Sequence, residues 1–445
     1  MRHRTIALAL VGALAATAAG CDDPLEVNPR ASIIEAEAYD EPVELEIAVL
    51  GVYDGLQQSD GAYARNTIVY PDLYADVLDF TGTYQTDAQV DQGTVTAENV
   101  AIADIWSDYY DVVNRANNVI ASAPALADEV GQEQVDEWMA QAQFGRALSY
   151  FNLVRFFGGV PLVLEPTWSV EEDLQPARAT EAEVYAQIEA DLNAAMLALP
   201  SSGTSYMPTV GAAEMLLAKA HMEQGDYGAA LPLLNDVIGG GYQLMPNYAD
   251  IFAVEDNPEL VFALEFTVND NNSLAFWFYP DDFGGRLGFA PTSELETSYE
   301  GTERFEASIG FDSYGSSFGN KYFRIVNGDD DVPVLRLADA YLMRAEANLR
   351  EGAAADVVLA DINEVRERAG IEPLEPVDYS SVEALIQAIA HERYLELAME
   401  GHRFFDLRRL GLAQDELGLN EYQMLFPIPQ RELDVNQNLE QNPGY

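Results

Sequence analysis

The pentapeptide GSSFG around Ser317 has the residue types and spacing of a nucleophilic catalytic site. It matches the pattern G-x-S-x-G, in which the serine hydroxyl attacks a carbonyl carbon, and Asp331 followed by His391 or His402 keeps the chain order of a hydrolase triad. That chemistry needs a strand before the serine and a helix after it. A strand-like run, NKYFRIV, follows here instead, and the flanking glycines and serines indicate a hairpin loop. Hydrolysis through Ser317 is therefore the least favoured interpretation.

Other catalytic and metal-binding patterns are incomplete. His391 opens a match to the zinc motif H-E-x-x-H, but Leu395 stands where the second histidine is needed. A phosphate-binding loop requires Gly-Lys, and neither Lys219 nor Lys321 follows a glycine. The 75 acidic residues give no means of singling out the carboxylate pair of a glycosidase. We therefore expect no enzyme active site, no metal centre and no cofactor.

Residues 269–289, NDNNSLAFWFYPDDFGGRLGF, combine aromatic rings with amide, carboxylate and guanidinium groups. Sugars present apolar C–H faces that stack on rings, and hydroxyl groups that need paired donors and acceptors. If residues 275–279 are extended, Trp277 and Tyr279 share one face of the strand, opposite the two phenylalanines. That face is the predicted ligand face. A run that is wholly buried, or that contacts a membrane barrel, is the alternative.

The predicted ligand-binding residues come from three segments of the chain. The run described above is expected to supply Trp277, Tyr279, Asp282, Phe283 and Arg286. A second wall is expected from Tyr84, in the early loop TGTYQTD, and from Trp168, which follows the strand-like segment VPLVL at residues 160–164.

The only cysteine, Cys21, follows an uncharged apolar run. Residues 5–20 carry no charge and follow a basic head, which is typical of a secretory signal. The run is too short and too rich in alanine to be a convincing permanent membrane span. Small residues directly before the cysteine resemble a bacterial lipobox, so we expect a lipid anchor on Cys21. An ordinary signal cleavage after Gly20 and a cysteine of the core are the alternatives.

The chain is strongly acidic, with 75 Asp and Glu against 23 Lys and Arg and a net charge of −52. Phosphate groups would be repelled, so sequence-independent binding to nucleic acid is excluded. Adhesion to anionic lipid through a basic patch is disfavoured for the same reason. Such a surface suits concentrated salt, which screens the repulsion. The preference for arginine over lysine also fits a GC-rich genome.

The hydrophobic periodicity predicts a mainly α fold with one interruption. Apolar residues recur at helical spacing in residues 47–56 and 102–119. Two later stretches, 218–238 and 345–365, share the pattern A-x-A-x-x-x-x-G, typical of a tetratricopeptide-like hairpin of two helices. Between them, residues 251–333 combine alternating apolar residues with many turn-forming residues. We expect a helical-hairpin scaffold with a loop-rich insert that contains short strands.

Several motifs resemble the SusD/RagB family in that family's order along the chain. They are RALSYFNLVRFFGGVPLV at 146–163, LADAYLMRAEANLREG at 337–352, INEVRERAGI at 362–371, HERYLELAMEGHRFFDLRRLG at 391–411, and the ending FPIPQRELDVNQNLEQNPGY. The resemblance implies a SusD-like fold and an outer-membrane lipoprotein, facing the cell exterior, that captures a nutrient, usually a glycan. It also implies a partner, a SusC-like TonB-dependent barrel that receives the nutrient.

The chain is expected to divide into four regions. They are a signal peptide at 1–20, a lipid-proximal tether at 21–44, an N-terminal helical region at 45–250, and a C-terminal region at 251–445 made of the insert (251–333), a helical part (334–411) and a tail (412–445). A tetratricopeptide-like scaffold that only organises other outer-membrane proteins is the alternative function. A pure scaffold has no need of an aromatic insert, so we favour the binding protein.

Overall fold

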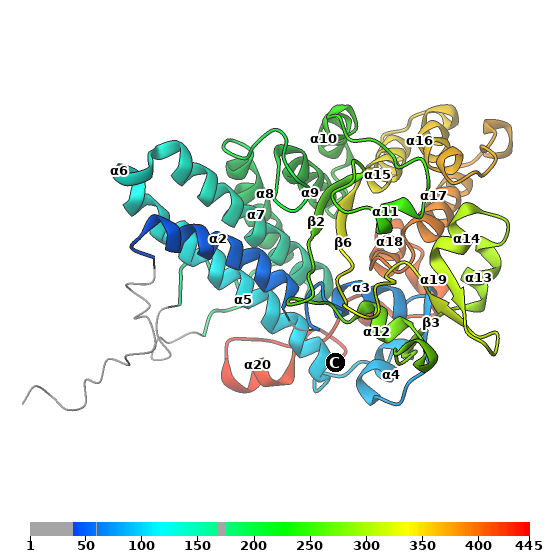
Figure 1. Cartoon of the computed structure of the whole chain (residues 1–445), viewed down its shortest axis with the longest axis horizontal. Helices are drawn as coiled ribbons and strands as arrows, with labels where there is room; N and C mark the ends of the chain where they lie inside the picture. The colour runs from blue at the N-terminus through cyan, green and yellow to red at the C-terminus, as the bar shows by residue number, and fades with distance from the viewer. Residues whose placement is uncertain (1–38, 59, 168–174) are drawn as a thin grey trace, which may run out of the picture.

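The structure, a computed structural model, describes residues 39–58, 60–167 and 175–445. The N-terminal helices lie at one end of the body and the later helical hairpins at the other (Figure 1). The predicted signal segment, Cys21 and Trp168 lie outside the described residues, as does most of the predicted tether. Within the described residues, no helix has the length and the apolar character needed to cross a membrane.

Long helices build the first half of the chain, as the periodicity predicts. Its helices are α2 (Pro42–Gln57), α3 (Asn66–Leu73), α4 (Gln85–Asp91), α5 (Val100–Ser122), α6 (Ala127–Val130), α7 (Gln132–Phe157) and α8 (Glu181–Ala195). The predicted apolar positions of α5, from Ile102 to Val119, are buried. Helix α7 ends at Gly158, whose φ of 74° suits a residue without a side chain.

Helix α2 occurs where it is expected, but the predicted apolar positions do not all face the core. Ile47 is 62% exposed and Leu50 is 54% exposed, whereas Leu45 and Val49 are buried. Val43 is also exposed, at 60%, so one side of α2 carries an uncovered row of aliphatic side chains. The helix is therefore apolar on two faces, and only one of them packs against α5 and α7.

The predicted helical hairpins are present and stack on one another. Their helices are α9 (Val210–Glu223), α10 (Tyr227–Gly239), α15 (Leu337–Arg350), α16 (Ala355–Arg368), α17 (Val382–Leu397) and α18 (Arg403–Leu410). The turn of the first pair holds Gly225 at φ 77°, and the turn of the second pair holds Gly352 at φ 83°. Because α10 packs on α15, the two pairs form one continuous stack. The mainly α, hairpin-based fold is confirmed.

The insert at 251–333 contains short helices as well as the predicted short strands. Its elements are α11 (Asp250–Ala253), β2 (Leu260–Leu264), α12 (Leu274–Phe278), η3 (Asp281–Phe283), β3 (Phe289–Pro291), α13 (Ser293–Tyr299), α14 (Glu303–Ser308), β4 (Ile309–Phe311), β5 (Ser317–Gly319) and β6 (Val332–Arg336). Each strand has one antiparallel partner, in the pairs β2–β6, β4–β5 and β3 with β1 (Leu78–Phe80). The insert is therefore tied to the first half through β1.

The segment 160–164, predicted to be a strand, is extended but forms no ladder. Side chains take the place of a neighbouring strand. The Tyr110 hydroxyl donates to the carbonyl of Pro161 at 2.7 Å, and the amide of Asn117 donates to the carbonyl of Val163 at 2.9 Å. The hydroxyl of Tyr150 accepts from the backbone N–H of Val163 at 2.8 Å. Buried backbone groups are nearly always paired, and in this partly buried segment side chains of helices α5 and α7 supply partners.

The C-terminal tail closes the core of the first half. Its elements are α19 (Ala413–Leu417), η5 (Glu421–Met424) and α20 (Gln430–Val435). The ring of Tyr74 lies edge-on between Phe404 and Phe426, with centroids 4.8 and 4.9 Å away. The backbone N–H of Phe426 donates to the carbonyl of Phe156 at 2.7 Å, and the amide of Asn442 donates to the carbonyl of Phe157 at 3.0 Å.

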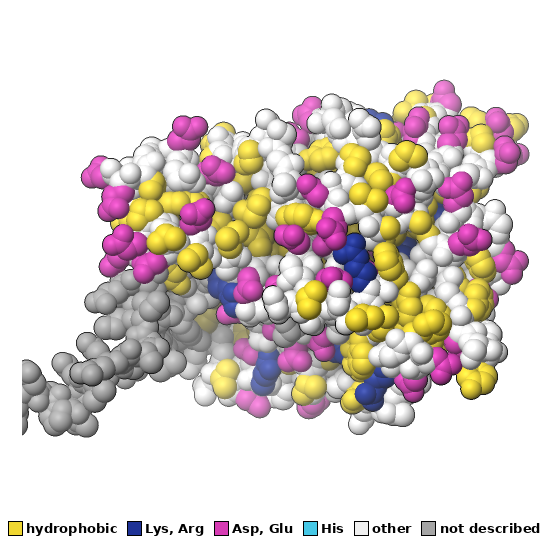
Figure 2. Space-filling model, in the orientation of Figure 1, with side chains coloured by type: hydrophobic (Ala, Val, Ile, Leu, Met, Phe, Trp, Pro, Cys, Tyr) yellow, Lys and Arg dark blue, Asp and Glu magenta, His cyan; other side chains and the backbone are white. Residues whose placement is uncertain are grey.

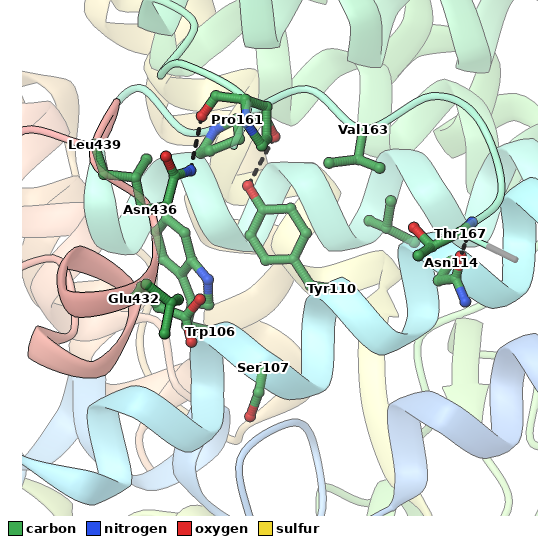
Figure 3. Close-up of a pocket in the computed structure, with 13 residues that line it drawn as sticks. Trp106, Ser107, Tyr110, Asn114, Pro161, Val163, Thr167, Glu432, Asn436 and Leu439 are labelled. Carbon is green, nitrogen blue, oxygen red and sulfur yellow. Dashed lines mark hydrogen bonds between the residues drawn. The ribbon is translucent and has the colours of Figure 1, made fainter. Parts of the chain in front are cut away.

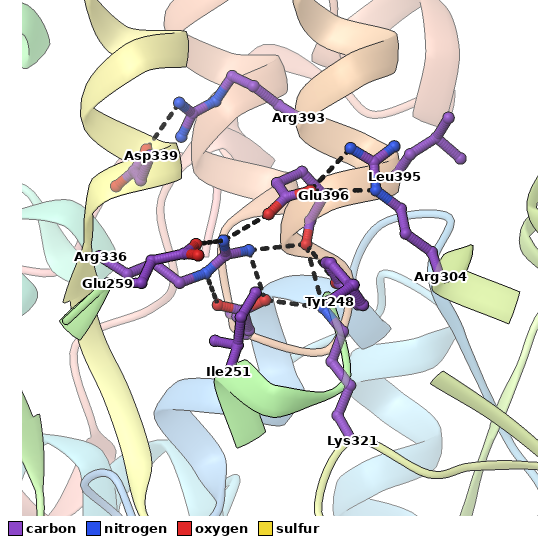
Figure 4. A network of polar contacts seen from close by, with 12 residues as sticks. Tyr248, Ile251, Glu259, Arg304, Lys321, Arg336, Asp339, Arg393, Leu395 and Glu396 are labelled. Atoms are coloured by element: carbon purple, nitrogen blue, oxygen red, sulfur yellow. Dashed lines mark hydrogen bonds and ion pairs between the residues drawn. The ribbon is translucent and has the colours of Figure 1, made fainter. Parts of the chain in front are cut away.

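A cluster of buried charges joins the insert to the hairpin stack (Figure 4). We call it the central ion network, and its members are Glu259, Arg304, Lys321, Arg336, Arg368, Glu392, Glu396 and Glu400. Arg336 bonds Glu259 at 3.0 Å and Glu400 at 2.7 Å, and it also reaches Glu396. Arg304 bridges Glu392 and Glu396 at 2.6 and 2.7 Å.

Two glutamates of α17, Glu392 and Glu396, and Glu400 just after the helix find partners in distant segments of the chain. Glu392 and Glu396 lie four residues apart on one face of α17, and all three side chains are buried. Burial opposes ionisation of Glu396, but the guanidinium groups of Arg368, Arg336 and Arg304 overcome it and lower its pKa.

We predict that Glu396→Ala lowers the free energy of unfolding by about 3–5 kcal/mol, because it leaves buried guanidinium groups without their shared carboxylate. Urea denaturation followed by circular dichroism measures this change. The exposed Glu129 of α6 provides the matched control, and Glu129→Ala should change stability by no more than about 0.5 kcal/mol. Equal stability of the two variants would contradict a structural role for the network.

Candidate functional site: an aromatic surface

Trp277 lies on α12, and the chain after this helix folds back against it. The backbone N–H of Arg286 donates to the carbonyl of Phe276, and that of Gly288 donates to the carbonyl of Trp277, both at 2.8 Å. A Cβ atom at position 288 would lie 2.5 Å from the indole ring. Glycine at this position therefore lets the returning backbone pass directly beside the tryptophan.

Strands β1 and β3 bring the early loop of Tyr84 to the same place. Phe80 of β1 pairs with Phe289 of β3, and Tyr84 then begins α4. The rings of Tyr84 and Trp277 meet edge to face, with centroids 5.9 Å apart at 70°. Residues almost two hundred positions apart in the sequence thus form one surface, because a strand pair joins their loops.

Two arginines lie against these rings. The guanidinium carbon of Arg286 is 4.9 Å from the centre of the Tyr84 ring and 5.4 Å from that of Trp277. Arg65, which is buried, lies 4.9 Å from the indole ring. Sequence reasoning missed Arg65, because nothing in its local sequence links it to a loop two hundred residues later.

We call the group of Tyr84, Phe276, Trp277 and Arg286 the aromatic platform. Tyr84 is 45% exposed and Phe276 is 42% exposed, Arg286 is exposed, and Trp277 is half-buried. Hydrophobic side chains gather over α12 and β3 on the face seen in Figure 2. The platform is an open surface with aromatic faces and a cationic donor, and it can stack on a ring and donate hydrogen bonds to it.

Tyr279 and Trp277, predicted to share a face, point to different sides. Residues 274–278 form a helix, not a strand, and positions two apart on a helix are separated by roughly 200°. Tyr279 is 8% exposed, its ring lies 4.5 Å from that of Phe318, and its hydroxyl donates to the amide oxygen of Asn320. Tyr279 is a core residue in this structure.

Phe283 and Asp282 lie near Tyr279, away from the ring contacts of the platform. Phe283 is 49% exposed and packs on Tyr279 and Phe318, with ring centroids 5.9 and 5.5 Å away. Asp282 is exposed and accepts a hydrogen bond from the hydroxyl of Ser313 at 3.1 Å. The structure thus brings Tyr84, Trp277 and Arg286 together and places Tyr279, Asp282 and Phe283 apart from them.

The environment of Ser317 lacks the geometry of a nucleophile elbow. Ser317 begins β5, and Ile309–Phe311 pairs with it as an antiparallel hairpin. No helix follows the serine directly, and Asp331 accepts its hydrogen bond from Tyr206. His402 is partly buried, and desolvation lowers its pKa to about 3. In the part of the chain that the structure describes, no group of three or more His, Cys, Asp or Glu could hold a metal ion.

The fold and this surface define a class of helical-hairpin proteins that carry an aromatic face on a loop-rich insert. Family models agree with this description. Residues 25–222 match the model "Starch-binding associating with outer membrane", and residues 314–423 and 413–445 match the SusD family model. The chain belongs to the SusD/RagB family.

Relatives match over nearly the whole chain. SusD-like protein P25 of Formosa agariphila is 27% identical over 94% of both chains. A solved structure described as a laminarin-binding SusD-like protein is 29% identical, with a TM-score of 0.82 over 92% of this chain and 100% of that one. The starch-binding protein SusD of Bacteroides thetaiotaomicron is 37% identical over 130 residues, or 26% of this chain.

We predict that Tyr279→Ala lowers the free energy of unfolding by about 3–5 kcal/mol, because it leaves a cavity beside Phe318. Tyr84→Ala should cost less than about 1 kcal/mol, since the Tyr84 ring is nearly half exposed. Chemical denaturation of both variants beside the wild type measures the difference. If Tyr279→Ala were as stable as the wild type, Tyr279 would not be a core residue and would again be a candidate ligand-binding residue.

Proposed function

We propose that this protein is a cell-surface lipoprotein that captures a glycan on the aromatic platform and delivers it to a SusC-like TonB-dependent outer-membrane transporter. The observation that carries the proposal is the contact between the exposed ring of Tyr84 and the half-buried ring of Trp277, with Arg286 beside both rings. Sugar rings stack on aromatic faces, and their hydroxyl groups accept hydrogen bonds from a guanidinium group.

The ligands of two relatives support a glycan as the ligand of this protein. One relative of similar fold is described as binding laminarin, and another is described as binding starch. Both ligands are chains of glucose, so glucose oligosaccharides are the first compounds to test. Binding, and not catalysis, fits a platform that carries no nucleophile with an adjacent base.

The membrane anchor and the partner barrel are part of the same proposal. Cys21 follows a signal-like segment, and one matching family model is described as associating with the outer membrane. The exposed row of Val43, Ile47 and Leu50 on α2 begins at the end of the predicted tether and offers an apolar surface to a partner. A lipid on Cys21 would hold this helix near the membrane.

Trp277→Ala and Tyr84→Ala should each weaken binding of a glucose oligosaccharide about tenfold, because each removes a stacking contact worth about 1 kcal/mol together with apolar contact area. Calorimetry with laminarin and starch oligosaccharides measures the affinity, and circular dichroism checks the fold. Tyr422→Ala, which removes an exposed aromatic ring far from the platform in sequence, is the matched control. Unchanged affinity in both platform variants would place the glycan elsewhere.

We also predict that radioactive fatty acid is incorporated into the wild-type protein and not into Cys21→Ala, because the thiol is the expected attachment site. Asp23→Ala keeps the cysteine and should remain labelled. Equal labelling of the wild type and Cys21→Ala would rule out lipid attachment at this residue.

A further inference from the structure

A cavity of about 320 Å³ lies between α5, the extended segment after α7 and the C-terminal tail (Figure 3). Its volume falls within the range of small-molecule sites, roughly 300–1,000 Å³. None of its lining residues belongs to the aromatic platform. It is therefore a separate feature of the surface, built from segments that the platform does not use.

Successive turns of α5 give the cavity an aromatic wall. Trp106 and Tyr110 are four residues apart on one helix face, with ring centroids 5.0 Å apart at 40°. Phe157 packs against Trp106 with centroids 5.1 Å apart, and the Tyr110 hydroxyl is held by the carbonyl of Pro161. Both rings are therefore fixed before any ligand arrives, which lowers the entropy cost of binding.

The aromatic wall carries a polar group that has no partner among the described residues. Trp106 as a whole is 4% exposed, and its indole N–H donates to none of the described residues, but the nitrogen is not among their fully buried polar atoms without a partner. Buried tryptophan N–H groups usually have a hydrogen-bond acceptor. An acceptor oxygen on a molecule in the cavity would satisfy this donor.

Further polar groups stand around the wall. Asn114 accepts a hydrogen bond from the backbone N–H of Thr167 at 2.9 Å through its oxygen, which leaves the amide N–H groups of Asn114 to donate. Glu432 of α20 lines the cavity and lies beside Trp106 in Figure 3. Its carboxylate can accept from two hydroxyl groups and would repel an anion. Apolar side chains, including those of Val113, Val163 and Leu439, form much of the remaining lining.

We propose that this cavity is a second binding site, which takes a sugar ring of an uncharged glycan. The ring would stack on the half-buried ring of Tyr110, accept from the indole N–H of Trp106 and the Asn114 amide, and donate hydroxyl groups to Glu432. An apolar ligand would leave these polar groups unpaired, and an acidic sugar would meet the carboxylate. The chemical class of the ligand rests on the proposed glycan function, whereas the position of the site does not.

Two substitutions address the cavity while sparing its aromatic wall. Ser107→Phe places a ring into the lining from a half-buried position. Glu432→Ala removes the carboxylate acceptor from a residue that forms an ion pair with its neighbour Arg431. Asp434→Ala, on the same helix α20 but outside the lining, is the matched control. Circular dichroism establishes that each variant is folded.

The experiment titrates the full chain with short laminarin and starch oligosaccharides by calorimetry and by ligand-observed NMR. Two sites per chain are expected in the wild type and one in a Trp277→Ala, Tyr84→Ala background. In that background Ser107→Phe and Glu432→Ala should each weaken binding at least tenfold, and Asp434→Ala should not.

The outcomes separate the two proposals. The cavity proposal is wrong if the platform double variant loses all binding. It is also wrong if residual binding in that variant is unchanged by Ser107→Phe and Glu432→Ala. If the platform substitutions leave binding unchanged and the cavity substitutions abolish it, the platform proposal is wrong and the cavity proposal stands. A wild type that binds none of these oligosaccharides overturns both.

Discussion

The central ion network is the interaction on which the rest of the structure depends. Arg336 stands at the end of β6 and reaches glutamates that precede β2 and lie on or just after α17, while Arg304 and Lys321 reach the same acidic helix from the insert. Removing one member would leave another buried charge unpaired, at a cost of several kcal/mol. The network therefore fixes how the insert sits on the hairpin stack, and through the insert it fixes the loops that carry the aromatic platform.

The network also explains where the few cations of an acidic chain are found. Both lysines are buried in ion pairs, Lys219 with Asp339 and Lys321 with Glu400, each at 2.6–2.7 Å. With several arginines also inside, the negative charge is concentrated on the surface. An exposed arginine such as Arg286 is then a local exception, and its position between two aromatic rings becomes more informative than it would be on a neutral protein.

The sequence was sufficient where local pattern decides the structure. Five positions of α5 were expected in the core from their spacing, and the helix buries them. The secondary structure of the five-residue run LAFWF could not be predicted, because hydrophobic periodicity does not distinguish a short buried strand from a short helix. Because the run is a helix and not the expected strand, Tyr279 lies in the core instead of on the expected surface, whereas Trp277 lies on the platform. The partners of Glu396 and the cavity beside Trp106 could not be predicted from the sequence, because both depend on contacts between segments far apart in the chain.

The closure of the first half by the C-terminal tail has a consequence for the order in which the chain folds. Asn442 meets Phe157 across 285 residues, and Phe426 completes the ring cluster around Tyr74. A chain that leaves the ribosome N-terminus first must hold the apolar sides of α3 and α7 uncovered until its last residues arrive, and contacts of such long range form slowly. A chain truncated before Phe426 would therefore leave the rings of Tyr74 and Phe404 without the aromatic partner that covers them, and exposed apolar surface of this kind favours aggregation.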